Sequence, residues 1–371
     1  MDIDELLRYA VKYGASDLHI TVGNPPILRV NGRLKKIPGP ALTATDAQAL
    51  IHPILTEEQR AAVERKREID LSYTWGTSSA VHSGTVSVEY VTPERIRARV
   101  NVFLDLTGIG AAFRIIPAQI RRLEELPAPE SVAELTRAPS GLVLVTGPTG
   151  CGKSTTLASM IDRIDQERAA RIITIEDPIE YIFRSRNCLI SQREIGTHSK
   201  SFAAALRACL REDPDVILVG EMRDLETIQL ALNAAETGHL VLSTLHTSSV
   251  AQTVDRVVDV FPADQHEYVR QIFANVIQGI IAQKLLVRKD GRGRLAAMEV
   301  LIVTPAVRNM IRENKSHQVF SMVQTGSEHG MQTMDQCLTE LLRKGLISHE
   351  VALAAAVERK LFGPARAEDE L

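Results

Sequence analysis

The residues with the clearest chemical potential form the run Gly147-Pro148-Thr149-Gly150-Cys151-Gly152-Lys153-Ser154, which matches the pattern G-x-x-x-x-G-K-[ST]. An apolar run precedes it and a segment with helical periodicity follows, so a strand, a glycine-rich loop and a helix come in the order that a phosphate-binding loop needs. In such a loop the backbone N–H groups and the helix dipole face the phosphates. Lys153 is expected to reach the β- and γ-phosphates and Ser154 to ligate Mg²⁺. These residues, together with Thr155, therefore predict an ATP and Mg²⁺ site.

Polar residues also follow three apolar runs that have the character of buried parallel strands. Glu180 comes shortly after the first run, Glu221 comes two positions after the second, and His246 directly follows the third. Ligands of open α/β sheets bind at the carboxyl ends of the strands, so these side chains are expected near the phosphate loop. We assign Glu221 to the Mg²⁺ site, with Ser154, and Glu180 to orienting the attacking water. The alternative for either acid is a helix cap or a solvated loop residue.

Two histidines flank the third of these runs. His239 and His246 lie at its opposite ends, and on one strand this spacing is about 23 Å. They cannot share a metal ion at that distance. We expect His246, at the nucleotide end, to sense the γ-phosphate, and His239 to have a structural role.

Composition narrows the class of protein. The chain has 371 residues, of which 44% are hydrophobic, enough for two domains with sizeable cores. Lys+Arg number 43 and Asp+Glu 46, and this balance, without an aromatic and basic stacking groove, argues against a nucleic-acid partner. The acidic N-terminus shows no signal peptide, and no apolar run reaches ~18 residues. The four cysteines are isolated, which argues against a structural zinc site or a disulfide framework and favours a reducing cytoplasm.

Residue patterning predicts the first part of the chain to be a small α+β domain. Residues 1–116 alternate short helices and strands, with Asn31-Gly32 as a hairpin turn, and predict an antiparallel sheet. Residues 117–139 contain four prolines and predict a linker with one short helix.

The rest of the chain is predicted as an α/β core followed by helices. Strands and helices alternate over residues 140–304, including a long helix at 265–286 and a strand at 294–302. Residues 305–362 predict a helical region, and residues 363–371 a disordered tail.

Three segments resemble motifs of the type II/type IV secretion ATPase superfamily. Thr174 to Glu180 is similar to its Asp box, and Gly238 to His246 to its His box. Arg211 to Glu221 resembles its Walker B segment, in which Gly220 stands where most P-loop enzymes carry Asp. The resemblance implies an α/β fold with a RecA-like P-loop NTPase core, an N-terminal PAS-like α+β domain and a C-terminal helical segment.

Within that superfamily the chain resembles the retraction ATPases of type IV pili. Ala306 to Glu313 is similar to their retraction motif, and Ser16 to His19, with the following Pro-Pro and Asn-Gly, resembles their PAS-like domain. This implies a homohexamer that couples ATP hydrolysis to pilus retraction and twitching motility. It also implies an inner-membrane platform protein and a paralogous ATPase as partners, and peripheral attachment to the inner face of the cytoplasmic membrane.

Other functions stay open beside the retraction motor. One is an accessory ATPase that regulates a partner motor, and another is a related secretion or extension ATPase. A RecA-like nucleic-acid translocase is the third, and the balanced charge speaks against it. The family resemblance further implies that N-terminal arginines reach the neighbouring subunit's nucleotide. Since Thr107 stands where the family usually has Arg, Arg99 and Arg114 are the candidates, and the alternative for each is a salt bridge on the sheet face. The segment Thr77 to Pro93 is longer than the family's usual connection.

Two hypotheses concern single side chains. Cys151 stands where the family usually has Ser, and its place beside Lys153 at a helix N-terminus predicts a reactive thiolate. The alternative is a small side chain turned away from solvent. Arg308 and Arg312 share one helix face by their spacing and predict a docking surface, with a solvated face as the alternative.

Overall fold

The computed structural model describes residues 2–30, 32–75, 96–116, 120–291 and 293–363. The chain divides into two compact units. Unit 1 comprises Met1–Gln119 with Glu180–Ile182, and unit 2 comprises Ile120–Ile179 with Phe183–Leu371. Residues 77–93, the segment that exceeds the family's usual length, and the C-terminal tail from 364 onward lie outside the described residues.

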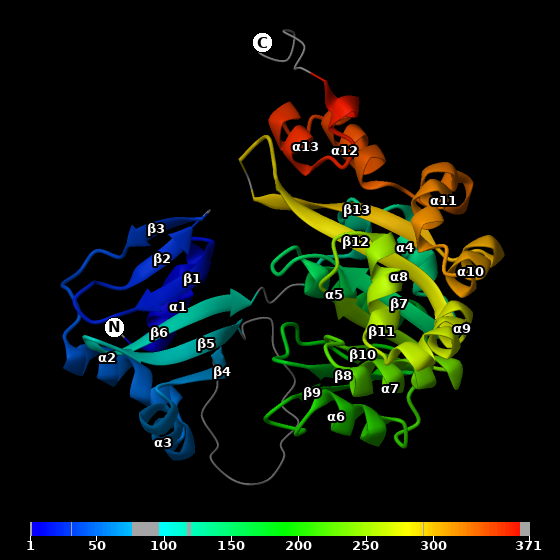
Figure 1. The fold of residues 1–371 in the computed structure, drawn as a ribbon. Helices are drawn as coiled ribbons and strands as arrows, with labels where there is room; N and C mark the ends of the chain where they lie inside the picture. The colour runs from blue at the N-terminus through cyan, green and yellow to red at the C-terminus, as the bar shows by residue number, and fades with distance from the viewer. Residues whose placement is uncertain (1, 31, 76–95, 117–119, 292, 364–371) are drawn as a thin grey trace. The chain divides into compact units, whose positions relative to one another are not determined.

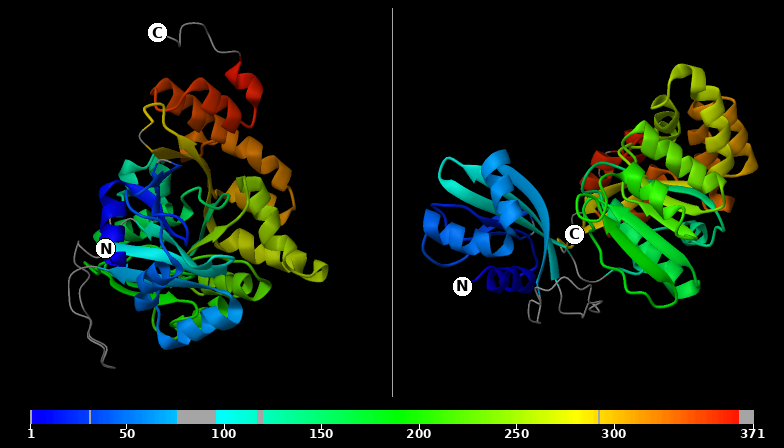
Figure 2. Two further views of the ribbon diagram at one scale, coloured as in Figure 1. Left: turned by 90° about the vertical axis from the view of Figure 1, so that its left-hand side faces the viewer. Right: turned by 90° about the horizontal axis from the view of Figure 1, so that it is seen from below.

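Unit 1 is built on a six-stranded antiparallel sheet with the strand order β3-β2-β1-β6-β5-β4. Val30 pairs with Arg33 across the expected hairpin turn. Helices α1, α2 and α3 gather on one side of this sheet (Figure 1, Figure 2). The strands are β1 (Ala15–Ile20), β2 (Ile27–Val30), β3 (Arg33–Lys36), β4 (Glu68–Trp75), β5 (Ile96–Asp105) and β6 (Gly108–Ile116), and the helices are α1 (Ile3–Lys12), α2 (Ala44–Ile51) and α3 (Glu57–Lys66).

Apolar and polar residues alternate along the strands, and this alternation explains which face of the sheet the helices cover. Leu18 and Ile20 of β1 are fully buried with Val100 and Phe113 in the core of unit 1, whereas Asp17, one position before Leu18, forms ion pairs with arginines. The helices begin at side-chain caps that accept backbone N–H bonds, Asp2 for α1, Thr43 for α2 and Thr56 for α3. The expected α+β domain is confirmed.

Unit 2 contains a seven-stranded sheet with the order β13-β12-β7-β11-β10-β8-β9. Neighbouring strands are parallel except β13, which pairs antiparallel with β12. Central strands β7, β10 and β11 are buried at every residue, as expected when helices cover both faces. The strands are β7 (Gly141–Thr146), β8 (Arg171–Glu176), β9 (Leu189–Glu194), β10 (Val216–Val219), β11 (Leu240–Leu245), β12 (Ile277–Val287) and β13 (Arg294–Ile302).

The helices of unit 2 form two layers around this sheet. One hydrophobic core joins the sheet to α6, α7, α8 and α9, and the other joins it to α4 and α5 (Figure 1). The helices are α4 (Glu130–Leu135), α5 (Lys153–Glu167), α6 (Phe202–Cys209), α7 (Leu225–Glu236), α8 (Val250–Asp259) and α9 (His266–Val276). The RecA-like arrangement expected from the sequence is therefore present.

The prediction of one long helix at residues 265–286 is wrong. Helix α9 ends at Val276 and strand β12 begins at Ile277, with no loop between them. Residues 277–283 are buried on both faces of the sheet, apart from the half-buried Gln278, so the period-two alternation that marks a strand is missing. Pairing with β7 on one side and β13 on the other makes this run a strand. A Cβ on Gly279 would lie 2.6 Å from Leu135 Cδ1, so α4 packs tightly against the backbone of β12.

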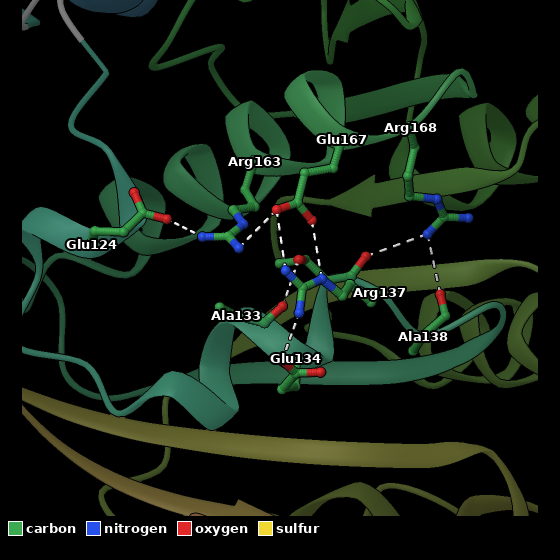
Figure 3. Close-up of polar contacts among 9 residues, drawn as sticks. Glu124, Ala133, Glu134, Arg137, Ala138, Arg163, Glu167 and Arg168 are labelled. Carbon is green, nitrogen blue, oxygen red and sulfur yellow. Dashed lines mark hydrogen bonds and ion pairs between the residues drawn. The ribbon is translucent and has the colours of Figure 1, made fainter.

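The segment expected as a linker, residues 117–139, belongs to unit 2 from Ile120 onward. Leu123, Val132 and Leu135 are buried in the core beneath α5. Figure 3 shows the polar contacts that bind this segment to the end of α5. Arg163 pairs with Glu124 and Glu167, Arg137 pairs with Glu134 and Glu167, and Arg168 donates to the carbonyls of Thr136 and Ala138.

The C-terminal helical region agrees with its prediction. Its last two helices form a small core with the ends of β12 and β13, centred on Met334, Leu338 and Leu341, whereas its first two pack into the core that contains α9. Its helices are α10 (Pro305–Arg312), α11 (Val319–Thr325), α12 (Met334–Arg343) and α13 (His349–Ala355), and five short 3-10 turns in the unit lie at Leu123–Glu125, Ala263–Gln265, Ser316–Gln318, Ser327–His329 and Arg359–Phe362. Within the described ranges, no helix has the length and apolar character needed to cross a membrane.

Candidate nucleotide site

The predicted phosphate loop lies between β7 and α5. Gly147, Gly150 and Gly152 have φ angles of 141°, 78° and 94°, which residues other than glycine rarely adopt. A Cβ on Gly147 would lie 2.4 Å from the carbonyl oxygen of Gln283, so this position also needs glycine for space. The motif therefore has the strand, loop and helix context that phosphate binding requires.

The Cys151 side chain is turned inward from this loop. It is 3% exposed, and a Cβ on Gly147 would lie 2.6 Å from its sulfur. Burial raises the pKa of the Cys151 thiol, and the charge of Lys153 opposes this without overcoming it. The hypothesis of a reactive thiolate is wrong, because the sulfur faces the protein interior.

The structure brings together the lysine, the acid and the histidine predicted from three separate strands. Lys153 Nζ lies 3.5 Å from His246 Nδ1, and His246 Nε2 lies 2.9 Å from Glu221 Oε1. The parallel pairing of β7 with β11 and of β11 with β10 places the three strand ends side by side. Lys153 also donates to the carbonyl of Gly147 at 2.7 Å.

Glu221 is an oriented carboxylate. Arg223 Nη2 contacts Glu221 Oε2 at 2.8 Å, while His246 contacts the other oxygen. Burial alone would raise the pKa of Glu221, but the hydrogen bond from Arg223 and the charges of His246 and Lys153 outweigh it, so its pKa lies below its usual value. The carboxylate is therefore ionised at neutral pH and fixed in direction.

Gly220 explains the departure from the usual Walker B acid. Its N–H donates to the carbonyl of Ile175 at 2.8 Å, and a Cβ on Gly220 would lie 3.2 Å from that oxygen and 3.3 Å from Glu176 Cα. The ends of β8 and β10 thus approach each other closely, and a side chain at this position would push the backbone of β8 away by a few tenths of an ångström. Glu221 becomes the first acid after β10.

Comparison with known proteins identifies the family. Residues 1–353 match the profile of the family described as type II/IV secretion system protein. The chain belongs to this family.

Its relatives within the type II/IV secretion system family include pilus ATPases. The chain is 50% identical to the type IV pilus retraction ATPase PilT of Pseudomonas aeruginosa, over 95% of this chain and 97% of that protein. It is 38% identical to the type IV pilus ATPase PilU of the same organism, over 96% and 89%. The crystal structure of the pilus retraction motor PilT with bound ADP superposes with a TM-score of 0.85 at 46% identity, covering 97% of this chain and 98% of that chain. The chain is an ATPase of this family.

The remaining predicted residues lie elsewhere in the fold. Glu180 follows β8 and is half-buried, and residues 180–182 group with unit 1, so its role stays a prediction. His239 Nδ1 lies 2.8 Å from the carbonyl of Ala234 at the end of α7, which agrees with a structural role. Arg99 Nε pairs with Asp70 at 3.9 Å and Arg114 Nε with Asp17 at 3.2 Å. The Arg99 side chain is 45% exposed and the Arg114 side chain is 70% exposed, so these salt bridges leave both accessible to a further partner.

The Arg308 side chain is bound within the fold, whereas the docking surface that it was predicted to form with Arg312 stays a prediction. Its Nη1 donates to the carbonyls of Ala274 and Asn275 at the end of α9, at 2.5 and 2.6 Å, and its Nη2 donates to Gln278. It therefore caps a neighbouring helix, where a cation is favourable. Arg312 is exposed and contacts Asn275 Oδ1 at 3.1 Å.

Sequence reasoning missed two residues that contact this site, Arg223 and Gln283. Arg223 stands two positions after Glu221, a spacing from which its ion pair with that acid could have been suspected. Gln283 carried no local signal, because its segment was assigned to a helix and its partners are more than 100 positions away.

Proposed function

We propose that the protein is a hexameric ATPase motor that drives type IV pilus retraction and twitching motility. The contact of Lys153, His246 and Glu221 supports the ATPase part of this proposal, because three separately predicted groups meet beside the phosphate loop. The near-complete coverage of PilT at 50% identity supports the pilus part.

The chemical roles follow from the polar groups of the site. In this proposal Lys153 and the N–H groups of the loop bind the β- and γ-phosphates, and His246 senses the γ-phosphate. Glu221 is proposed to hold Mg²⁺ and its water shell, and Glu180 to orient the attacking water. The ion pairs of Glu221 fix its orientation before nucleotide binds, which reduces the reorganisation needed during the reaction.

The donor set at the loop suits Mg²⁺. Ser154 supplies a hydroxyl and Glu221 a carboxylate, both hard oxygen donors, and Mg²⁺ in phosphate sites commonly takes one or two protein oxygens, with phosphates and water filling the rest. Each oxygen of Glu221 keeps a further lone pair beside its present partner. Bound Mg²⁺ would neutralise charge that develops on the phosphate oxygens. Across the ranges that the structure describes, no group of three or more His, Cys, Asp or Glu side chains could hold a metal by itself.

The proposed ring assigns a second function to unit 1. Arg99 and Arg114 would reach the nucleotide of a neighbouring subunit and stabilise charge in the transition state. The proposed partners are an inner-membrane platform protein and a paralogous ATPase of the PilU kind, and the ring would attach peripherally to the inner face of the membrane.

Two measurements test the proposal. Purified protein should hydrolyse ATP in steady state, and expression of the gene should restore twitching in a strain that lacks its retraction ATPase. An accessory subunit would instead show negligible turnover alone and restore motility only beside a functional motor. Turnover without any rescue of motility would favour a related secretion or extension ATPase.

A further inference from the structure

Gln283 lies beneath the phosphate loop on strand β12. The residue is 1% exposed. The parallel pairing of β12 with β7 places Ala282 opposite Thr146, the last residue before the loop, so Gln283 reaches the level at which the loop begins.

Both ends of the Gln283 amide bind the loop and the helix that follows it. Its Nε2 donates to the carbonyl of Cys151 at 2.8 Å, and its Oε1 accepts from Thr156 Oγ1 at 3.0 Å. Because a carbonyl can only accept, the NH₂ group must face Cys151, and this fixes the orientation of the amide. A Cβ on Gly152 would lie 3.2 Å from Nε2, so the loop packs directly on this side chain.

We propose that Gln283 is a positioning residue that sets the shape of the phosphate loop. A loop that presents its N–H groups to a phosphate must direct carbonyls elsewhere, and a buried carbonyl without a partner is costly. Gln283 supplies the hydrogen-bond donor for the inward carbonyl of Cys151. Through its second bond, to Thr156, it fixes the position of this carbonyl relative to the first turn of α5. This inference rests on the proposed nucleotide site and adds a residue that does not touch the nucleotide.

The same strand provides a matched control. Gln278 also lies on β12, and its Nε2 donates to the carbonyl of Ser140 at 3.0 Å, just before β7 begins. The two glutamines thus bind the segments at the two ends of β7 in the same manner. Only Gln283 is at the end that carries the phosphate loop.

The expected effect is on nucleotide binding more than on the chemical step. The loop N–H groups contact phosphates in the bound state and in the transition state alike, and weakening such contacts raises KM with less change in kcat. Replacing Gln283 by Met keeps the approximate size of the side chain and removes both hydrogen bonds. We expect the Kd for Mg-ADP to rise about tenfold, because binding would then have to restore a loop shape that one or two net hydrogen bonds hold in the wild type.

The experiment measures the Kd for Mg-ADP by calorimetry, together with kcat and KM for ATP, in Gln283→Met, Gln278→Met and Lys153→Ala. Gln278→Met should bind Mg-ADP within about twofold of wild type, since its contact lies at the other end of β7. Wild-type affinity in Gln283→Met, or an equal loss in Gln278→Met, overturns the inference. Normal binding in Lys153→Ala would instead overturn the proposed nucleotide site itself. If Gln283→Met does not fold, Thr156→Val removes the hydroxyl of the same contact, and its Kd decides: a rise supports the inference and an unchanged value refutes it.

Discussion

At the scale of single residues, the orientation of Glu221 depends on two side chains from different segments. Arg223 and His246 hold its two oxygens, and Lys153 contacts the same histidine. A carboxylate fixed in this manner can bind Mg²⁺ and its water shell without first losing orientational freedom. Its negative charge is the property that the proposed mechanism uses.

Replacing Glu221 by Gln should therefore keep nucleotide binding and remove most turnover. The amide has the same size but carries no charge, and losing a group that stabilises the transition state costs about 10²–10³ in kcat. Steady-state ATP hydrolysis and Mg-ADP binding are the two measurements. Glu226→Gln is the control, since this exposed acid lies on α7 and pairs with Arg207. Near wild-type turnover in Glu221→Gln would contradict the assignment.

Cys151 should react slowly with maleimide. Its sulfur is buried against Gly147, and burial raises the pKa of the thiol, so both access and thiolate fraction are low. We expect wild type and Cys151→Ser to lose ATPase activity at the same rate under alkylation. Fast inactivation that only wild type shows, with protection by Mg-ADP, would mean that the side chain turns outward in solution.

Glu299 of β13 makes stability depend on pH. It is 3% exposed, and burial raises its pKa to about 7, against the opposing effects of the Val250 N–H and of Lys284. Between the usual value near 4.5 and about 7 the folded state holds a proton that the unfolded chain has lost. Stability therefore falls as pH rises through this window and is constant above it.

Glu299→Gln mimics the protonated form at every pH. We expect the variant to be more stable than wild type by about 3 kcal/mol at pH ~8 and by less than about 1 kcal/mol at pH ~5. Denaturant unfolding at the two pH values measures this difference. Glu267→Gln on α9 controls for the loss of one carboxylate, and a stability difference that does not change with pH in Glu299→Gln would refute the prediction.

At the scale of elements, the sequence predicted the helices and strands that short local patterns specify, but not those that depend on contacts between distant segments. The phosphate loop, the strand before it and the helix after it were predictable because one short run specifies all three. Glu221 and His246 were predictable because each follows an apolar strand and parallel strands end together. Strand β12 was not predictable from the sequence. A run buried on both faces lacks the alternation of buried and exposed residues that marks a strand, and only its pairing with β7 and β13 distinguishes it from a helix.

The orientation of long side chains could not be predicted from spacing alone. Arg308 and Arg312 do share a helix, but the end of α9 lies close enough to Arg308 to take its guanidinium. No sequence period records that tertiary contact. The same holds for Gln283, whose two partners lie in α5 and in the loop before it.

Arg308→Ala should destabilise the contact between α9 and α10. It removes three hydrogen bonds, two of them to carbonyls at a helix end, and we expect a loss of about 1–2 kcal/mol in the free energy of unfolding. Arg312→Ala, the matched control on the same helix, should cost less than ~0.5 kcal/mol because the side chain is exposed. Thermal unfolding of both variants measures the difference. If the Arg308→Ala and Arg312→Ala variants were equally stable, the hydrogen bonds of Arg308 would not contribute to the stability of the fold.

At the scale of the whole molecule, the two units carry different parts of the proposed mechanism. Unit 2 holds the phosphate loop, Glu221 and His246, whereas Arg99 and Arg114 lie on neighbouring strands of unit 1. Arg114 pairs with Asp17 at 3.2 Å but its side chain is 70% exposed. An exposed pair contributes little to stability, so its removal should leave the fold intact.

If Arg114 acts in the neighbouring subunit, two inactive variants should complement each other. Arg114→Ala keeps its own phosphate loop and lacks the arginine that it supplies to a neighbour, whereas Lys153→Ala lacks the loop lysine and still supplies the arginine. An interface that joins the intact loop of the first to the intact arginine of the second contains a complete site. A mixture of the two purified variants should therefore recover part of the ATPase activity that each lacks alone. Native mass spectrometry establishes that mixed rings form. Mixed rings without recovered turnover, or full turnover of Arg114→Ala alone, would exclude Arg114 from the neighbouring site, and the same mixture with Arg99→Ala then tests the other candidate.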